Sequence, residues 1–326
     1  MNFHDVCGQE ALINHMQNAI RLGKISHAYI ISGEEGYDKL PLAEAFAQAV
    51  LCSNLNIEPC GECSSCRKAI HHNHPDIIYI SHEKPNLISA REIREQIVGT
   101  IDIIPYESKR KIYIVEDGEL INEQGQNILL KTIEDPPDYA TLIILTTNKD
   151  MFLPTVISRC VCLDMQPVNN EIIKSYLMRK GIVDYQADMA IDFAEGNPGK
   201  ALMIADDVDF KERRRLIISI FRDYTCYDPN DISRLAERLE KDSENIDSYM
   251  DLLLIFMRDA LILNTTGDEN RVHFREEMGA VRDLSKQPLS RINELINTVY
   301  EAKNRIDTGV TVSFAIEIML HKMKEI

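Results

Sequence analysis

The sequence predicts an α/β domain built on a parallel sheet, followed by regions that are helical throughout. In the first half of the 326-residue chain, short apolar runs alternate with stretches whose apolar residues recur at helical spacing. This is the pattern of parallel strands joined by crossover helices. After Met165 the strand-like runs stop, and only amphipathic segments continue. We therefore expect one α/β domain and a separate helical part.

Five apolar runs have the length of buried strands and are expected to form the sheet. They are residues 27–32, 76–80, 111–116, 141–147 and 161–165. The stretches between them that have helical spacing are residues 9–21, 39–51, 89–100 and 119–133. Ser89 and Glu92 fit a capping box, which predicts the start of the third of these helices.

The second half of the chain predicts two further domains. Segments 170–180, 185–194 and 199–205 are short and helical, and longer amphipathic segments follow at 248–263, 288–305 and 311–323. The run GNPG at 196–199 is a turn signal between two of the short helices. We predict an α/β domain over 1–166, a small helical domain over 167–208 and a C-terminal helical domain over 209–326.

The composition indicates a globular protein with an acidic surface. Apolar residues make up 44% of the chain, which excludes a disordered or collagen-like protein, and the net charge is −16. Phosphate binding relies on clustered Lys and Arg, so this charge disfavours independent binding of nucleic acid. No uncharged apolar run approaches the ~20 residues that cross a bilayer, and the first residues lack a secretory signal. We expect a cytoplasmic protein with no membrane contact.

Four of the eight cysteines lie close together with the spacing C-x7-C-x2-C-x2-C, at Cys52, Cys60, Cys63 and Cys66. Two successive C-x2-C steps form tight knuckles that aim thiolates at one point, and closed four-ligand sites of this kind hold Zn²⁺. The spacing therefore predicts one structural zinc ion. Two alternatives stay open: four reduced thiols without a metal, or a nearby histidine in place of Cys52 as the fourth ligand. The nearby histidines are His71, His72 and His74.

The loop after the first predicted strand is a phosphate-binding loop that lacks several of its parts. Its sequence, GEEGYDKL at 33–40, compares with G-x-x-x-x-G-K-[ST], in which backbone N–H groups surround the phosphates. Gly33 and Lys39 match this pattern. Asp38 replaces the second glycine and adds a negative charge beside the phosphates, and Leu40 replaces the hydroxyl that holds Mg²⁺.

The third predicted strand shows a matching change. It ends in Glu116 and Asp117, the reverse of the Asp-Glu order in which the Asp serves Mg²⁺ and the Glu polarises the attacking water. An acidic pair at the end of a strand is common, so this signal is weak by itself. Together with Asp38 and Leu40 it favours a nucleotide-binding fold without the activity.

Four runs of the sequence resemble those of the AAA+ clamp-loader ATPases of bacterial DNA polymerase III. They are GQE at 8–10, HAYI at 27–30, NILLKTIEDPPD at 127–138 and TTNKDMFLPTVISRC at 146–160. A four-cysteine insertion after the first helix is typical of several subunits of this family. The resemblance implies a RecA-like AAA+ domain with a zinc-binding insertion, a small helical lid domain and a C-terminal helical collar domain through which five subunits form a ring.

The degenerate phosphate loop implies, within that family, a stator-like subunit that does not hydrolyse ATP at its own site. The implied partners are the γ/τ and δ subunits and, through the complex, the β sliding clamp and primer–template DNA. Arg159, within Ser158-Arg159-Cys160, matches the family's arginine finger, which reaches the γ-phosphate of ATP on a neighbouring subunit. A planar, permanently charged guanidinium suits that role.

The resemblance also implies a nucleotide site whose residues are degenerate here. Its candidate residues are Gly33, Gly36, Lys39, Glu116, Asp117 and Thr147. Thr147 belongs to the sensor-1 region, where a polar side chain normally contacts the γ-phosphate. A sensor-2 arginine is missing from 196–201, where Lys200 is the nearest cation. Two other interpretations are retained: an active γ/τ-like ATPase, which Lys39 supports, and a zinc-containing DNA-binding or regulatory module.

Overall fold

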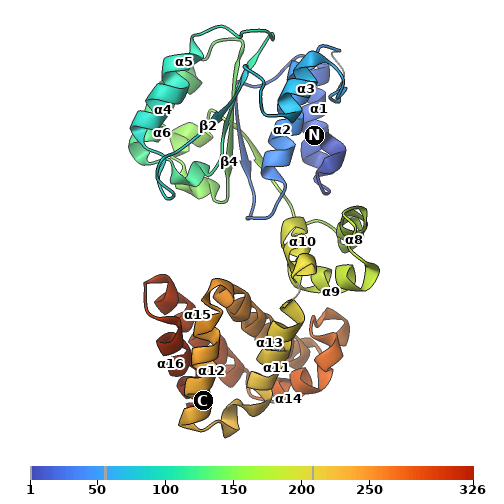
Figure 1. Ribbon diagram of the computed structural model, residues 1–326, viewed down its shortest axis with the longest axis vertical. Helices are drawn as coiled ribbons and strands as arrows, with labels where there is room; N and C mark the ends of the chain where they lie inside the picture. Colours follow the sequence, from blue (N-terminus) through green and yellow to red (C-terminus); the bar gives the residue numbers. More distant parts are fainter. Residues whose placement is uncertain (1, 55–56, 208) are drawn as a thin grey trace. The chain divides into compact units, whose positions relative to one another are not determined.

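The computed structural model describes residues 2–54, 57–207 and 209–326. The chain divides into two compact units, one that ends at Ala205 and one that runs from Asp206 to Ile326 (Figure 1). The predicted boundary residue 208 lies outside the described residues. The further division of the first unit at residue 166 stays a prediction.

The described part of the first unit contains a five-stranded parallel sheet in the order β2-β3-β4-β1-β5. The strands are β1 (Ala28–Ser32), β2 (Ile77–Ile80), β3 (Lys111–Val115), β4 (Ala140–Thr146) and β5 (Val161–Asp164). The predicted strands are confirmed to within one residue at their ends. Because all of them run in the same direction, their carboxyl ends share one edge, where Ser32 lies between Thr146 and Asp164. The candidate nucleotide site lies at this edge.

Helices cover both faces of the sheet, which explains why its strands are continuous apolar runs. On β1, Tyr29 and Ile31 face one core, whereas Ala28 and Ile30 face the other. Fully burying an Ile side chain stabilises the fold by about 1.5–3 kcal/mol. The helices on one side are α1 (Glu10–Arg21), α2 (Lys39–Leu51) and α3 (Ser64–Ile70), and those on the other are α4 (Ala90–Ile93), α5 (Gly99–Ile101) and α6 (Glu123–Glu134) (Figure 1).

The predicted helix 89–100 differs in its middle turn. Its capping box of Ser89 and Glu92 is confirmed. Between α4 and α5, however, Arg94–Val98 is π-helical, and the Gly99 N–H bonds back to the Arg94 carbonyl. The three short segments follow one another as one helical stretch, with apolar residues buried along it. These residues are Ile93, Ile97 and Ile101.

The predicted helix 119–133 begins too early. The chain first forms a 3-10 turn, Gly118–Leu120, and α6 starts only at Glu123. Asn122 sets this start, because its side chain accepts a hydrogen bond from the Gly125 N–H as an N-cap. Residue 119 is therefore free of the helix and lies at the edge of the sheet.

Three short helices follow β5: α8 (Asn170–Arg179), α9 (Asp184–Ala194) and α10 (Pro198–Asp206). They surround a small core of their own, to which Cys7 and Val168 contribute. The Gln9 side chain donates to the Gln166 carbonyl (2.6 Å) and accepts from the Gln166 N–H (3.0 Å). This pair of bonds connects the start of α1 to the segment that leads from the sheet to these helices.

The second unit is helical in its described residues. Its core contains a stack of Phe221 on Phe256, with ring centroids 4.4 Å apart, and Phe274 meets Phe256 edge-on at 5.1 Å. None of the helices in the described ranges is long and apolar enough to cross a membrane. The helices are α11 (Phe210–Asp223), α12 (Pro229–Lys241), α13 (Ile246–Thr266), α14 (Met278–Ser285), α15 (Leu289–Asp307) and α16 (Val312–Glu325).

Candidate nucleotide pocket and metal site

The four predicted zinc ligands lie together. The sulfur atoms of Cys52, Cys60, Cys63 and Cys66 are all within 4.8 Å of one another. The Cys63 N–H points at Cys60 Sγ (3.4 Å) and the Cys66 N–H at Cys63 Sγ (3.3 Å), so backbone dipoles support negative charge on these sulfurs. The cluster can hold a metal ion, and four thiolates fit the tetrahedral coordination of Zn²⁺. Residues 55 and 56 of this module lie outside the described residues.

His74 is engaged elsewhere and connects the cysteine module to the sheet. It is buried, and its Nδ1 accepts a hydrogen bond from the Asp76 N–H (3.1 Å). Its Nε2 lies 2.9 Å from Ser65 Oγ, which itself donates to the Leu51 carbonyl (2.8 Å). The ring is therefore neutral with its proton on Nε2, and burial lowers its pKa.

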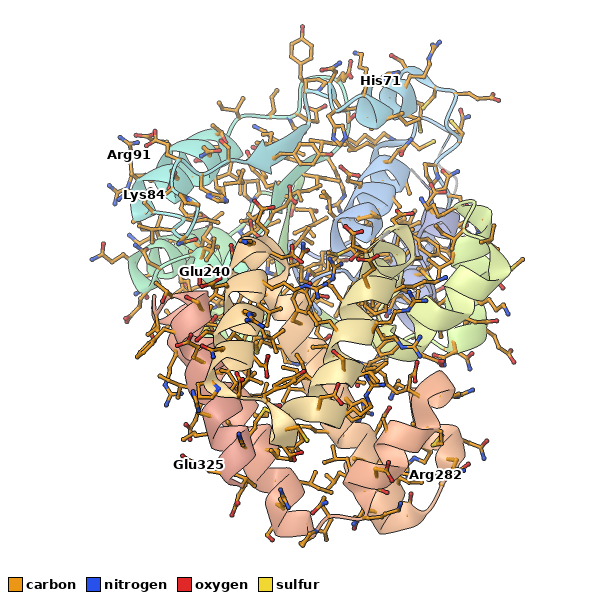
Figure 2. The ribbon with its side chains drawn as sticks, turned by 60° about the horizontal axis from the view of Figure 1, so that its bottom comes forward. His71, Lys84, Arg91, Glu240, Arg282 and Glu325 are labelled. Carbon is orange, nitrogen blue, oxygen red and sulfur yellow. The ribbon has the colours of Figure 1, made fainter. Side chains whose placement is uncertain are left out.

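The other two histidines also lie apart from the sulfur cluster. His72 Nδ1 is 3.2 Å from the Tyr79 hydroxyl. His71 is exposed at the end of α3, on the outside of the domain (Figure 2). Within the described ranges, the potential metal ligands that lie together include Cys52 and none of the three histidines, which favours Cys52 as the fourth ligand.

The degenerate phosphate loop borders a cavity of about 430 Å³ at the carboxyl edge of the sheet. Among the described residues that line it, five are acidic and one is a lysine, an arrangement that repels phosphate. Gly33 lies beside the cavity, where its N–H bonds to the Thr146 carbonyl (3.1 Å). The other predicted site residues are brought together in the lining, namely Gly36, Lys39, Glu116, Asp117 and Thr147.

Lys39 is used by its own loop. Its Nζ donates to the Gly33 carbonyl at 2.5 Å and to the Glu34 carbonyl at 2.9 Å. Burial lowers the pKa of the ammonium group, although neighbouring carboxylates, led by Glu119, act in the opposite direction. These two hydrogen bonds stabilise the conformation of the phosphate loop.

Asp38 also has a structural partner. Its Oδ2 accepts a hydrogen bond from the Cys7 N–H (2.9 Å), which connects the loop to the N-terminal segment. Burial raises the pKa of this carboxyl, and the bond from Cys7 acts against that rise. The residue that replaces the glycine of an active loop thus contributes a contact within the domain.

The sequence analysis did not identify Glu119 as part of the site. Its carboxylate accepts hydrogen bonds from Thr146 Oγ1 (2.8 Å), Thr147 N–H (3.1 Å) and Thr147 Oγ1 (2.5 Å). The donor groups of Thr146 and Thr147, in the predicted sensor-1 region, are therefore bonded to a side chain of the same chain. The signal that was missed is the break before α6, since Asn122 is a good N-cap and implies that residue 119 precedes the helix.

Asn197 and Gly199 connect the small helices to the phosphate loop. Asn197 Nδ2 donates to the Glu35 carbonyl (2.7 Å), and the Gly199 N–H donates to the Gly36 carbonyl (3.0 Å). A Cβ on Gly199 would lie 2.2 Å from that carbonyl oxygen, so only glycine permits this approach. The sequence analysis identified this run as a turn without this contact.

Arg159 lies outside the cavity, in the segment between α7 (Pro154–Ile157) and β5. Its side chain is 39% exposed and forms an ion pair with Glu134 at the end of α6 (2.9 Å). It also donates to the Thr155 carbonyl (3.0 Å). With Ser158 Oγ at 3.4 Å, three partners hold the guanidinium, and part of its surface is open to solvent.

Comparison with known proteins finds relatives among the subunits of DNA polymerase III. The family described as "DNA polymerase III, delta subunit" matches residues 8–169. The delta′ subunit of DNA polymerase III from Bacillus subtilis is 24% identical over 97% of this chain and 96% of its own length. The tau subunit from the same organism is 34% identical over 52% of this chain and 30% of its own length.

A solved structure of a gamma-subunit-related protein from Thermotoga maritima is 16% identical over 95% of this chain and 98% of that chain, with a TM-score of 0.44. The sheet order and the flanking helices are those expected of a RecA-like AAA+ domain. Among these relatives, the delta′ subunit from Bacillus subtilis matches along nearly its whole length, and the family model matches the part of the chain that contains the sheet. The chain is similar to subunits of the bacterial DNA polymerase III clamp loader, and to a delta′ subunit along nearly its whole length.

Proposed function

We propose that this chain is a non-catalytic, stator-like subunit of the delta′ type in the DNA polymerase III clamp loader. In this role it supplies Arg159 in trans to ATP held by a neighbouring subunit, while its own pocket hydrolyses none. Its partners in the ring are the γ/τ and δ subunits. The assembly loads the β sliding clamp onto primer–template DNA.

One observation carries the proposal: the polar groups of the pocket are engaged by the chain itself. Lys39 Nζ donates to its own loop, and Thr146 and Thr147 donate to Glu119. A nucleotide would have to break these bonds and enter beside five carboxylates. Arg159, in contrast, keeps the local sequence of the family's finger and a partly exposed guanidinium.

The cysteine cluster has a structural role in this proposal. Four thiolates complete the coordination of one Zn²⁺ and leave no position for water or substrate, so we assign no catalysis to the metal. The ion would fold the short excursion between α2 and β2, and His74 would connect that excursion to the sheet.

The test is reconstitution of the complex with its motor and δ subunits, using wild-type, Arg159→Ala and Arg91→Ala chains. Arg91 is the matched control, because it is an exposed arginine of the same unit in a surface ion pair with Glu83 (3.1 Å) (Figure 2). We expect Arg159→Ala to lower ATP turnover at the neighbouring site at least about tenfold and Arg91→Ala to leave it unchanged. Gel filtration checks that both variants assemble. Unchanged turnover in an assembled Arg159→Ala complex would contradict the proposal.

A further inference from the structure

The carboxyl end of β4 presents three hydrogen-bond donors to one carboxylate. Thr146 Oγ1, the Thr147 N–H and Thr147 Oγ1 all point at Glu119, at 2.8, 3.1 and 2.5 Å. Both carboxylate oxygens are used, Oε2 by two donors and Oε1 by one. An oxyanion with several accepting positions is thus already present where a terminal phosphate would lie in an active site.

The backbone brings Glu119 to this place. Asp117 adopts a left-handed conformation (φ +51°), and Gly118 then passes close to β4. A Cβ on Gly118 would lie 2.4 Å from Ile144 Cγ2 and 3.0 Å from the Leu145 carbonyl oxygen. Only glycine allows this approach, and the next residue is consequently within reach of the two threonines.

The phosphate-loop side of the cavity, at Glu35 and Gly36, is held by a second set of contacts within the chain. Asn197 donates to the Glu35 carbonyl, and its Oδ1 accepts from the Lys200 N–H (3.0 Å), so the side chain is fixed at both ends. The Gly199 N–H donates to the Gly36 carbonyl. These bonds join α10 directly to the phosphate loop.

We propose that Glu119 is an internal anion that takes the place of a terminal phosphate at Thr146 and Thr147, and that Asn197 closes the loop side, so that the pocket holds one conformation without nucleotide. The proposal rests on the proposed function, because it assumes that the pocket is not used for ATP. It adds which side chains of this chain hold the geometry of the pocket.

Hydrogen–deuterium exchange on the full chain tests this proposal with Glu119→Ala, Asn197→Ala and the control Glu35→Gln. Glu35 lines the same cavity, so its substitution removes a charge while its backbone bond to Asn197 is kept. We expect about tenfold faster exchange at 145–148 in Glu119→Ala and at 33–37 in Asn197→Ala, with less than about twofold change in the control. Addition of Mg·ATP to wild-type protein should leave exchange at both segments unchanged.

Glu119→Gln keeps the size of the side chain and serves as a second variant if Glu119→Ala fails to fold. Wild-type exchange rates in α1 and β2, which belong to the same unit as Glu119 and Asn197, indicate that a variant is folded. Exchange at 145–148 that matches the control in both Glu119 variants would overturn the proposal, as would nucleotide-dependent protection of the wild type. Since the assay uses the chain alone, its failure leaves the Arg159 proposal standing, and failure of the turnover assay leaves the exchange result intact.

Discussion

The two candidate sites of the first unit lie at opposite ends of the same helix and differ in how their polar groups are satisfied. At the start of α2, Lys39 and the threonines of β4 find partners within the chain. At its end, Cys52 joins three other cysteines whose sulfur atoms converge on one point. One site is complete as the chain folds, whereas the other gathers ligands for an ion.

This difference illustrates that residues of a ligand-binding motif can also bond within their own chain. Gly33 and Lys39 match an active phosphate loop, but their groups bond to each other. Binding there would exchange existing hydrogen bonds for new ones and place a polyanion among carboxylates, so little free energy is available. At the cysteines, metal binding would be coupled to folding, because the four thiolates would gain a common partner only with the ion.

Metal removal should have the largest effect. Chelation, or the substitution Cys66→Ala, is expected to lower the free energy of unfolding of the first unit by at least about 3 kcal/mol, because structural zinc contributes directly to folding. Mass spectrometry for metal content and thermal melts measure this. Cys226→Ala, an exposed cysteine outside the cluster, is the control and should keep one zinc per chain. The contrast between the two sites would be lost if protein purified without chelator contained no zinc and if chelator left its melting temperature unchanged.

The connection between the metal module and the sheet gives the next effect. His74→Ala is expected to cost about 2–3 kcal/mol, because it leaves a cavity and deprives the Asp76 N–H and Ser65 of a partner. His71→Ala, at an exposed position, should change stability by less than about 0.5 kcal/mol. Urea denaturation at neutral pH distinguishes the two, and equal costs would mean that His74 does not anchor the module.

The internal anion should give a smaller, pH-dependent effect. Burial raises the pKa of Glu119, but hydrogen bonds from Thr147 and Thr146 outweigh this and the net pKa lies below its ordinary value. The stabilisation is therefore complete above the ordinary carboxyl pKa of about 4.3 and is lost as the pH falls through the lowered value. Glu119→Gln should cost about 1 kcal/mol at pH 7, with the difference from wild type shrinking in acid. A difference that stays constant with pH would argue against the charge as its source.

Added nucleotide should have the smallest effect. At 100 times its Kd a ligand stabilises a protein by about 2.7 kcal/mol, which raises the melting temperature by several degrees. We expect a shift below about 1 °C with millimolar Mg·ATP and no turnover by the isolated chain. Lys39→Ala provides the matched comparison and should respond to nucleotide as the wild type does. A shift of several degrees that Lys39→Ala abolishes would favour an active γ/τ-like ATPase.

Local sequence patterns predicted the elements whose cause is itself local. The strands are apolar because both faces of the sheet are buried, and the cysteine spacing fixes its own geometry within fifteen residues. The roles of Glu119 and Asn197 were not predicted, because their partners are distant in sequence. Glu119 bonds to Thr146, which is 27 residues away, and Asn197 bonds to Glu35, which is 162 residues away. The helix start at Glu123 depends on one side-chain cap, which periodicity alone does not reveal.

The pair of bonds between Gln9 and Gln166 has a practical consequence for protein engineering. The Cys7 N–H also bonds to Asp38. Through these bonds the N-terminal segment connects α1, the phosphate loop and the segment that leads to the small helices. A shortened chain that starts after Gln9 would keep the four clustered cysteines, Arg159 and the whole sheet, yet lose these bonds. Tags and fusions are therefore better placed so that residues 2–9 keep their native path.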